Sequence, residues 1–186
     1  MFKTILCAVL FAVCATASAD QYFKVQHWSD TDLYRDYSRL SGLTTDFCTG
    51  LPAQVKTSGY IGLVHRGLVV GAVGWAVRIS YRTAPTLAEL GPKISGASPG
   101  NYIGSTWVPG AKSAGNIGSI EQHYAEANLA SVMDVAPGCY RLEVWGNSHS
   151  SLAPYTDGLV EVNGYPTETS DTYGYMATHV SPRPAP

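Results

Sequence analysis

The stretch VGWAVRISY, residues 73–81, decides the fold class of this chain. Its odd positions are apolar (Val73, Trp75, Val77, Ile79 and Tyr81), whereas its even positions are small or polar (Gly74, Ala76, Arg78 and Ser80). A strict period of two places alternate side chains on opposite faces, as in a strand with one face against a core. This stretch therefore predicts a half-buried antiparallel strand.

Similar segments flank this strand on both sides and are separated by glycine or proline. The other predicted strands are residues 60–64, 68–70, 102–108, 139–145, 158–162 and 173–180, with turns at 65–67, 135–138 and 163–164. Short strands with frequent turn signals are typical of two packed antiparallel sheets. We expect an all-β fold, mainly antiparallel: one β-sandwich domain over residues 20–180, of jelly-roll kind.

Three regions depart from this pattern. The spacing of Leu33, Tyr37 and Leu40, after Ser29 and before Gly42, predicts one short N-terminal helix. Residues 83–118 are rich in proline and glycine, which predicts long loops and no long strand. Residues 119–130 fit either a helix or a strand, and we favour a strand from Leu129 onward.

The two ends of the chain predict processing and a tail. Residues 1–19 combine Lys3, an apolar run too short to span a bilayer, and the small residues Ala17 and Ala19, which is the pattern of a secretory signal peptide. We therefore expect an extracellular protein. Residues 181–186 are rich in proline and are expected to be a disordered tail.

Cleavage after Ala19 leaves two cysteines, Cys48 and Cys139. In an oxidising compartment, two cysteines usually form one disulfide. The bridge would close a loop of 91 residues. The loss of chain entropy in the unfolded state would then stabilise the fold by about 4 to 5 kcal/mol.

Composition limits the partners of this chain. Charged residues are 14% of the sequence, the formal net charge is −2, and basic residues form no cluster. Nucleic acid is therefore excluded as a partner, and no segment of the predicted mature chain suggests a membrane span. A surface built from Tyr, Ser, Thr, Gly and Asn favours self-association into homo- or hetero-oligomers.

The sequence carries no recognisable catalytic constellation. The five histidines are scattered and form no HxH or HExxH pair, so we expect neither a metal nor another cofactor. Residues 96–100, GASPG, match the Gly-x-Ser-x-Gly spacing, but they lie in the predicted loop region and not at a strand-to-helix turn, so they do not indicate a nucleophile elbow. Glu143 and Glu161 occupy the polar sides of predicted strands, where carboxylates are normally solvated. We therefore expect a protein that is not an enzyme, with no catalytic residues.

Four residues are candidates for ligand binding. Tyr102 and Trp107 are aromatic rings in the predicted loop region, where they could stack on a sugar or pin the loop to the core. His65 and Arg66 lie in a predicted turn, a common place for a binding loop.

These observations favour a secreted, non-enzymatic structural, storage or matrix protein that assembles into oligomers through weakly charged, Tyr-rich faces. The alternative is a secreted binding module, either a lectin for a glycan or a carrier of a small apolar ligand. The sequence alone does not separate them, because a loop aromatic serves core, interface and sugar equally well.

Overall fold

The computed structural model describes residues 19–27, 31–65, 73–91, 106–117, 124–149, 160–162 and 174–183. The predicted signal peptide therefore lies almost entirely outside the described residues. So do Tyr102, Arg66, the strand predicted at residues 68–70, the predicted turn at residues 163–164 and the last three residues of the predicted tail.

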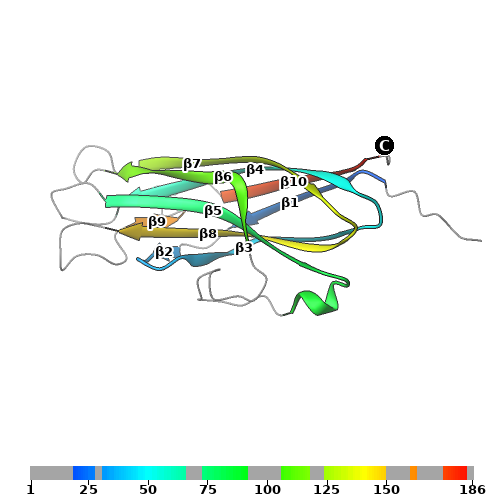
Figure 1. Ribbon diagram of the computed structural model, residues 1–186. Helices are drawn as coiled ribbons and strands as arrows, with labels where there is room; N and C mark the ends of the chain where they lie inside the picture. Colours follow the sequence, from blue (N-terminus) through cyan, green and yellow to red (C-terminus); the bar gives the residue numbers. More distant parts are fainter. Residues whose placement is uncertain are drawn as a thin grey trace, which may run out of the picture.

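Two antiparallel sheets form two layers of an elongated molecule (Figure 1). Sheet A contains six strands: β1 (Gln21–His27), β10 (Gly174–Pro182), β4 (Ala53–His65), β9 (Val160–Val162) and β2 (Thr31–Leu33) in path order, with β7 (Tyr124–Val135) paired to β4. Sheet B contains β3 (Ser38–Thr49), β8 (Gly138–His149), β5 (Val73–Ala84) and β6 (Thr106–Ile117). One short 3₁₀ turn, η1 (Ala88–Leu90), follows β5. The predicted β-sandwich is confirmed.

The long strands pair in a nested order. β1 pairs with β10, β3 with β8, β4 with β7, and β5 with β6, always antiparallel. Such nesting results when one long hairpin folds back on itself, so most ladders join residues far apart in sequence. It is the pattern expected of the finer prediction, a jelly roll, which stays a prediction.

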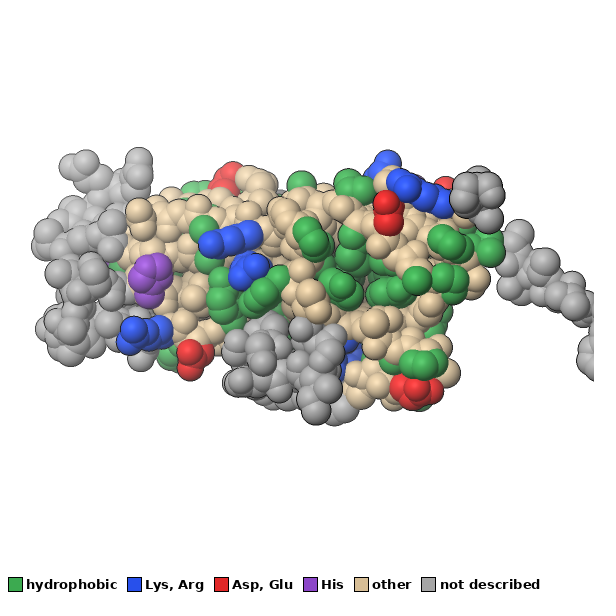
Figure 2. Space-filling model, viewed as in Figure 1, with side chains coloured by type: hydrophobic (Ala, Val, Ile, Leu, Met, Phe, Trp, Pro, Cys, Tyr) green, Lys and Arg blue, Asp and Glu red, His purple; other side chains and the backbone are tan. Residues whose placement is uncertain are grey.

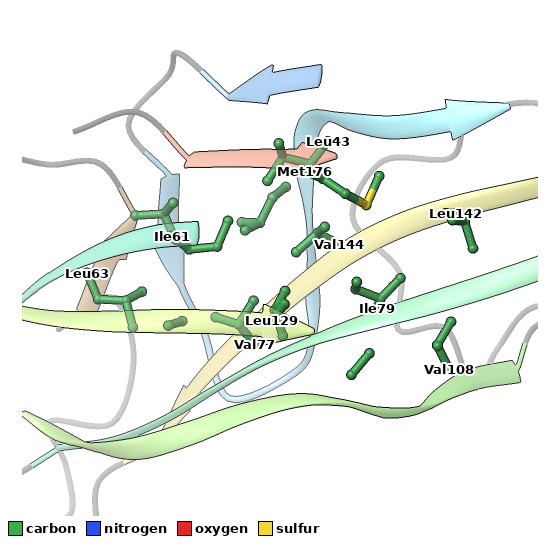
Figure 3. Packing of buried hydrophobic residues seen from close by; sticks show 14 of the residues in the cluster. Leu43, Ile61, Leu63, Val77, Ile79, Val108, Leu129, Leu142, Val144 and Met176 are labelled. Carbon is green, nitrogen blue, oxygen red and sulfur yellow. The ribbon is translucent and has the colours of Figure 1, made fainter. Parts of the chain in front are cut away.

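The core lies between the two sheets, as the alternation of residues 73–81 predicted. Val73, Trp75, Val77 and Ile79 of β5 are buried there. Figure 3 shows Val77 and Ile79 of sheet B pointing toward Leu129 and Met176 of sheet A. Burial of this apolar surface is the main force that holds the two layers together.

The predicted N-terminal helix is wrong. In its place the chain forms β2, a bend, and β3, and these strands pair with β9 and β8. Leu33 and Leu40 are both buried, but Tyr37 between them lies against Trp107. The helical spacing of these residues therefore arises by coincidence in two extended segments. Pairing with distant strands and packing in the core outweigh a weak local preference for helix.

Two regions are more regular than predicted. β6 extends through Pro109 and Gly110 to Ile117, because both residues fall in a bulge between the pairs Arg78–Lys112 and Ser80–Trp107. An edge strand tolerates proline at such a bulge, and Gly110 adopts a φ of 74°. β7 is a strand from Tyr124 onward, five residues before the predicted start, because it pairs with β4 along its whole length.

The start of β8 and the end of β10 test the predicted turn at residues 135–138 and the predicted tail. β7 ends at Val135 and β8 begins at Gly138, as the turn at residues 135–138 predicted. β10 continues to Pro182, two residues into the predicted tail, and the backbone N–H of Arg183 donates to the carbonyl of Pro52 at 2.8 Å.

The outermost strands of the two sheets lie against each other. β6 contacts β7 on one side of the sandwich, and β1 contacts β3 on the other. The Gln21 side chain donates to the carbonyl of Cys48 at 3.0 Å, and a Cβ on Gly42 (φ 86°) would lie 2.7 Å from the carbonyl oxygen of Gln26. Edge strands that face another strand are poor templates for strand addition.

Candidate functional site

The outer face of sheet B, which points away from the core, carries a grid of side chains set by the strand register. The side chains form three rows that cross β3, β8 and β5, and two of these rows continue to β6. They are Asp46–Arg141–Arg82, Thr44–Glu143–Ser80–Trp107 and Arg39–Trp145–Arg78–Lys112. Cross-strand neighbours on one face lie close enough to interact directly.

The predicted disulfide is confirmed and lies at one end of this face. Cys48 and Cys139 are directly paired residues of β3 and β8, with Cα atoms 4.0 Å apart. The next pair on this face is ionic: both Nε and Nη2 of Arg141 donate to the carboxylate of Asp46 at 2.7 Å. This bidentate geometry raises the pKa of Arg141 through its hydrogen bonds to Asp46.

Two arginines of this face also hold η1 against the sheet. The Nη1 atom of Arg82 donates to the carbonyl of Leu90 at 2.9 Å, and the Nη1 atom of Arg141 donates to the carbonyl of Gly91 at 2.7 Å. Leu90 is buried as a result. Part of this outer face is therefore covered by the chain itself.

Glu143 occupies the centre of the grid and is only 2% exposed. Its Oε1 lies 3.7 Å from Arg82 Nη2 and 3.8 Å from Arg39 Nη1. Burial raises the pKa of Glu143, and the three arginines 82, 39 and 141 offset this only in part. The prediction of a solvated carboxylate at this position is therefore wrong, because a strand face that alternation marks as polar can itself be covered.

Trp107 lies on the same outer face, beside the ion network. The guanidinium of Arg78 lies over its ring, 4.1 Å from the centroid, and the ring of Tyr37 is 4.9 Å away at an angle of 55°. The indole therefore already has an aromatic and a cationic partner within the described chain. Trp107 is half-buried, and these contacts join β6 to β5 and to the residue before β3 on the outer face of sheet B. Its role in ligand binding stays a prediction.

A polar hollow of about 430 Å³ lies next to this stack. Gly74, Ala76 and Ala114, which are outward-facing residues of β5 and β6, line it together with five polar side chains: Tyr37, Lys112, Asn116, Asn147 and His149. The imidazole of His149 covers Gly74 so closely that a Cβ there would lie 2.6 Å from its Cε1 atom. The hollow therefore exists because the strand residues at its floor are small, and polar side chains surround it.

The outer face of sheet A differs in character. Tyr60 and Tyr124 join their hydroxyls at 2.5 Å, and the Tyr60 hydroxyl also donates to Glu126 Oε1 at 3.1 Å. Burial, followed by the hydrogen bond to Tyr124, raises the pKa of Tyr60. The ring of Tyr175 stacks near Tyr60 at 6.3 Å, and Lys24 lies over it.

A shallow hollow of about 650 Å³ crosses the same face of sheet A. Small residues on its strands, Ser58, Ala130 and Ala177, contribute to it, and Tyr22 and Val132, which are 67% and 58% exposed, lie at its border. On the face of the molecule that Figure 2 shows, most side chains are neutral and the charged ones lie in a few small groups.

His65, the remaining described candidate, is the last residue of β4 and only 3% exposed. A buried position at a strand end does not offer its ring to a ligand in the described structure. Tyr102 and Arg66 lie outside the described residues, so the structure does not bring the four candidates together.

Sequence reasoning missed the ion network and the polar hollow. The available signal was the position of Arg78 and Arg82 on the polar side of one strand and of Arg141 and Glu143 on the polar side of another. These residues become neighbours only through the β5–β8 pairing, which the sequence does not reveal.

The described residues hold no group of three or more His, Cys, Asp or Glu side chains able to bind a metal ion. Nor does the described part of the chain contain a helix that is long and apolar enough to cross a membrane.

Comparisons with known proteins assign no family. No family model matches the chain, and no curated protein matches it. Among solved structures, a chain of the IBDV viral particle matches with a TM-score of 0.49 and 9% sequence identity. The match covers 97% of this chain and 36% of the viral chain, so this protein spans about a third of that chain's length.

Proposed function

We propose that this chain is a secreted, non-enzymatic structural protein that assembles with copies of itself through the outer face of sheet A. The observation that carries the proposal is a four-strand surface that no described segment covers, with exposed apolar and tyrosine side chains around a shallow hollow. Secretion rests on the signal-peptide pattern of residues 1–19.

The size of the face supports an interface. Strands β1, β10, β4 and β7 lie about 4.8 Å apart, and their ladders run for up to about 40 Å, which gives roughly 600 to 800 Å² per copy. A standard protein interface buries about 800 Å² on each partner. The face is therefore large enough for stable association.

Its charges also suit a self-complementary contact. Lys24 and Lys56 on β1 and β4 are matched by Glu126 and Asp134 on β7. A second copy related by a two-fold axis can place the basic strands of one molecule opposite β7 of the other. The packed sheet edges favour such face-to-face contact over strand addition.

Val132→Glu tests the proposal, because it places a charge on an apolar residue of the proposed interface that is 58% exposed. The matched control is Leu87→Glu, since Leu87 is a similarly exposed apolar residue (47%) located beside η1. We expect light scattering after size exclusion to give an oligomer for the secreted protein and for the control, and a monomer for Val132→Glu. A monomeric wild-type protein, or an oligomer that Val132→Glu leaves intact, would contradict the proposal.

The glycan-binding alternative has one observation in its favour, the polar hollow on sheet B. Nothing among the described residues favours the alternative of a carrier for an apolar ligand.

A further inference from the structure

The polar hollow on sheet B presents unused hydrogen-bonding groups. Lys112, Asn116 and His149 make no hydrogen bond or ion pair within the described part of the chain. Asn147 uses one amide hydrogen on the carbonyl of Arg35 at 3.3 Å, and its other polar sites remain available. Polar side chains that converge on one hollow without partners of their own are typical of a ligand site.

The charges around this hollow indicate an anionic ligand. Among the described residues, the lining includes Lys112 and no carboxylate, and Arg78 is the cross-strand neighbour of Lys112. Over the described strands of this outer face, five basic residues stand against two acidic ones: Arg39, Arg78, Arg82, Lys112 and Arg141 against Asp46 and Glu143. The chain as a whole has a net charge of −2, so this face is a local exception that attracts anions.

The uncharged side chains of the lining indicate that this ligand also carries hydroxyl groups. The amides of Asn116 and Asn147 can both donate and accept, which suits sugar hydroxyls better than a bare anion. Tyr37 adds an aromatic ring beside the Trp107–Arg78 stack. A volume of about 430 Å³ lies within the range of small-ligand sites.

We propose that this hollow binds an acidic saccharide, that is, an oligosaccharide with carboxylate or sulfate groups, with Lys112 and His149 facing the anionic group and the two asparagines facing hydroxyls. The site goes beyond the proposed assembly function and is independent of it, because the two surfaces lie on different sheets.

Calorimetric titration with three hexasaccharides tests the proposal: hyaluronan (carboxylate), heparin-derived (sulfate) and maltohexaose (neutral), all at 0.15 M salt. We expect binding to at least one acidic probe and none to maltohexaose. Lys112→Ala should weaken binding about tenfold, since a hydrogen bond to a charged group is lost. The control Lys56→Ala removes another exposed lysine, located on sheet A, and should change the affinity by less than about twofold.

Gly74→Ala gives a second test that removes no polar group. The new methyl group would displace the exposed imidazole of His149, so binding should weaken several-fold while the melting temperature stays close to that of the wild type. Equal loss with Lys56→Ala, equal affinity for maltohexaose, or no binding to any probe would overturn the proposal. Light scattering on Lys112→Ala separates it from the assembly function, because the oligomer should persist.

Discussion

The two outer faces of the sandwich are built from similar strands but behave differently. On sheet A, most of the outward side chains are at least partly open to solvent, with Tyr22 and Val132 among the most exposed large residues. On sheet B, Trp145, Arg141 and Glu143 also point away from the core, yet each is less than 10% exposed. The outer face of sheet A is exposed to solvent, whereas the outer face of sheet B is buried in part.

The two faces also differ in how their charged side chains are paired. The buried arginines of sheet B satisfy Asp46, Glu143 and the carbonyl groups at η1. A buried cation needs such partners, because desolvation makes an unpaired charge very costly. The open face of sheet A has no such demand, because its charged residues Lys24, Lys56, Glu126 and Asp134 are exposed to solvent.

The largest expected effect concerns the bridge at the end of the covered face. Replacing Cys48 and Cys139 together by Ser should lower the free energy of unfolding by about 4 to 5 kcal/mol, because a constraint on a 91-residue loop is lost from the unfolded state. Chemical denaturation under non-reducing conditions measures it. An unchanged transition midpoint would show that the covered face does not depend on the bridge.

The second prediction compares one aromatic residue on each face. Trp145→Ala should cost about 3 to 5 kcal/mol, because its ring is completely buried although it points away from the core. Tyr22→Ala on sheet A should change stability by about 0.5 kcal/mol or less in a monomeric sample. Thermal unfolding of both variants decides the matter, and equal losses would remove the contrast between the faces.

The smallest expected effect is a pH dependence caused by Glu143. Since the native fold raises the pKa of this carboxyl above its ordinary value of 4.5, the native state binds its proton more tightly than the unfolded chain does. Its contribution to stability is therefore complete below the ordinary pKa and decreases as the pH rises through the raised value.

Glu143→Gln should remove this contribution. The difference in unfolding free energy between the variant and the wild type should grow in favour of the variant as the pH rises from about 4 toward neutrality. Urea denaturation at a series of pH values measures it. A difference that is constant with pH would mean that the arginines fully offset the burial of the carboxylate.

Local patterns predicted several elements well. The alternation in residues 73–81 and 139–145 correctly located β5 and β8, because burying one face of a strand imposes a period of two on its side chains. The pairing of Cys48 with Cys139 followed from the number of cysteines left by the predicted cleavage. Trp107 stays a predicted ligand-binding residue, and its ring contacts Tyr37, which lines the polar hollow.

The failures share a physical cause. Leu33 and Leu40 have helical spacing, and Pro109 with Gly110 suggests a loop, but strand partners far along the chain override both local signals. The neighbours of Lys112 and His149 likewise depend on the β5–β6 and β5–β8 registers. A residue's own sequence context contains no information about such partners.

The sequence by itself therefore determined an all-β chain, its most regular strands and its disulfide, because these depend on local periodicity and on counting. The burial of part of the outer face of sheet B, in contrast to the open outer face of sheet A, depended on the tertiary structure. Burial of a face depends on what packs over it, and in a nested antiparallel fold that is set by segments distant in sequence.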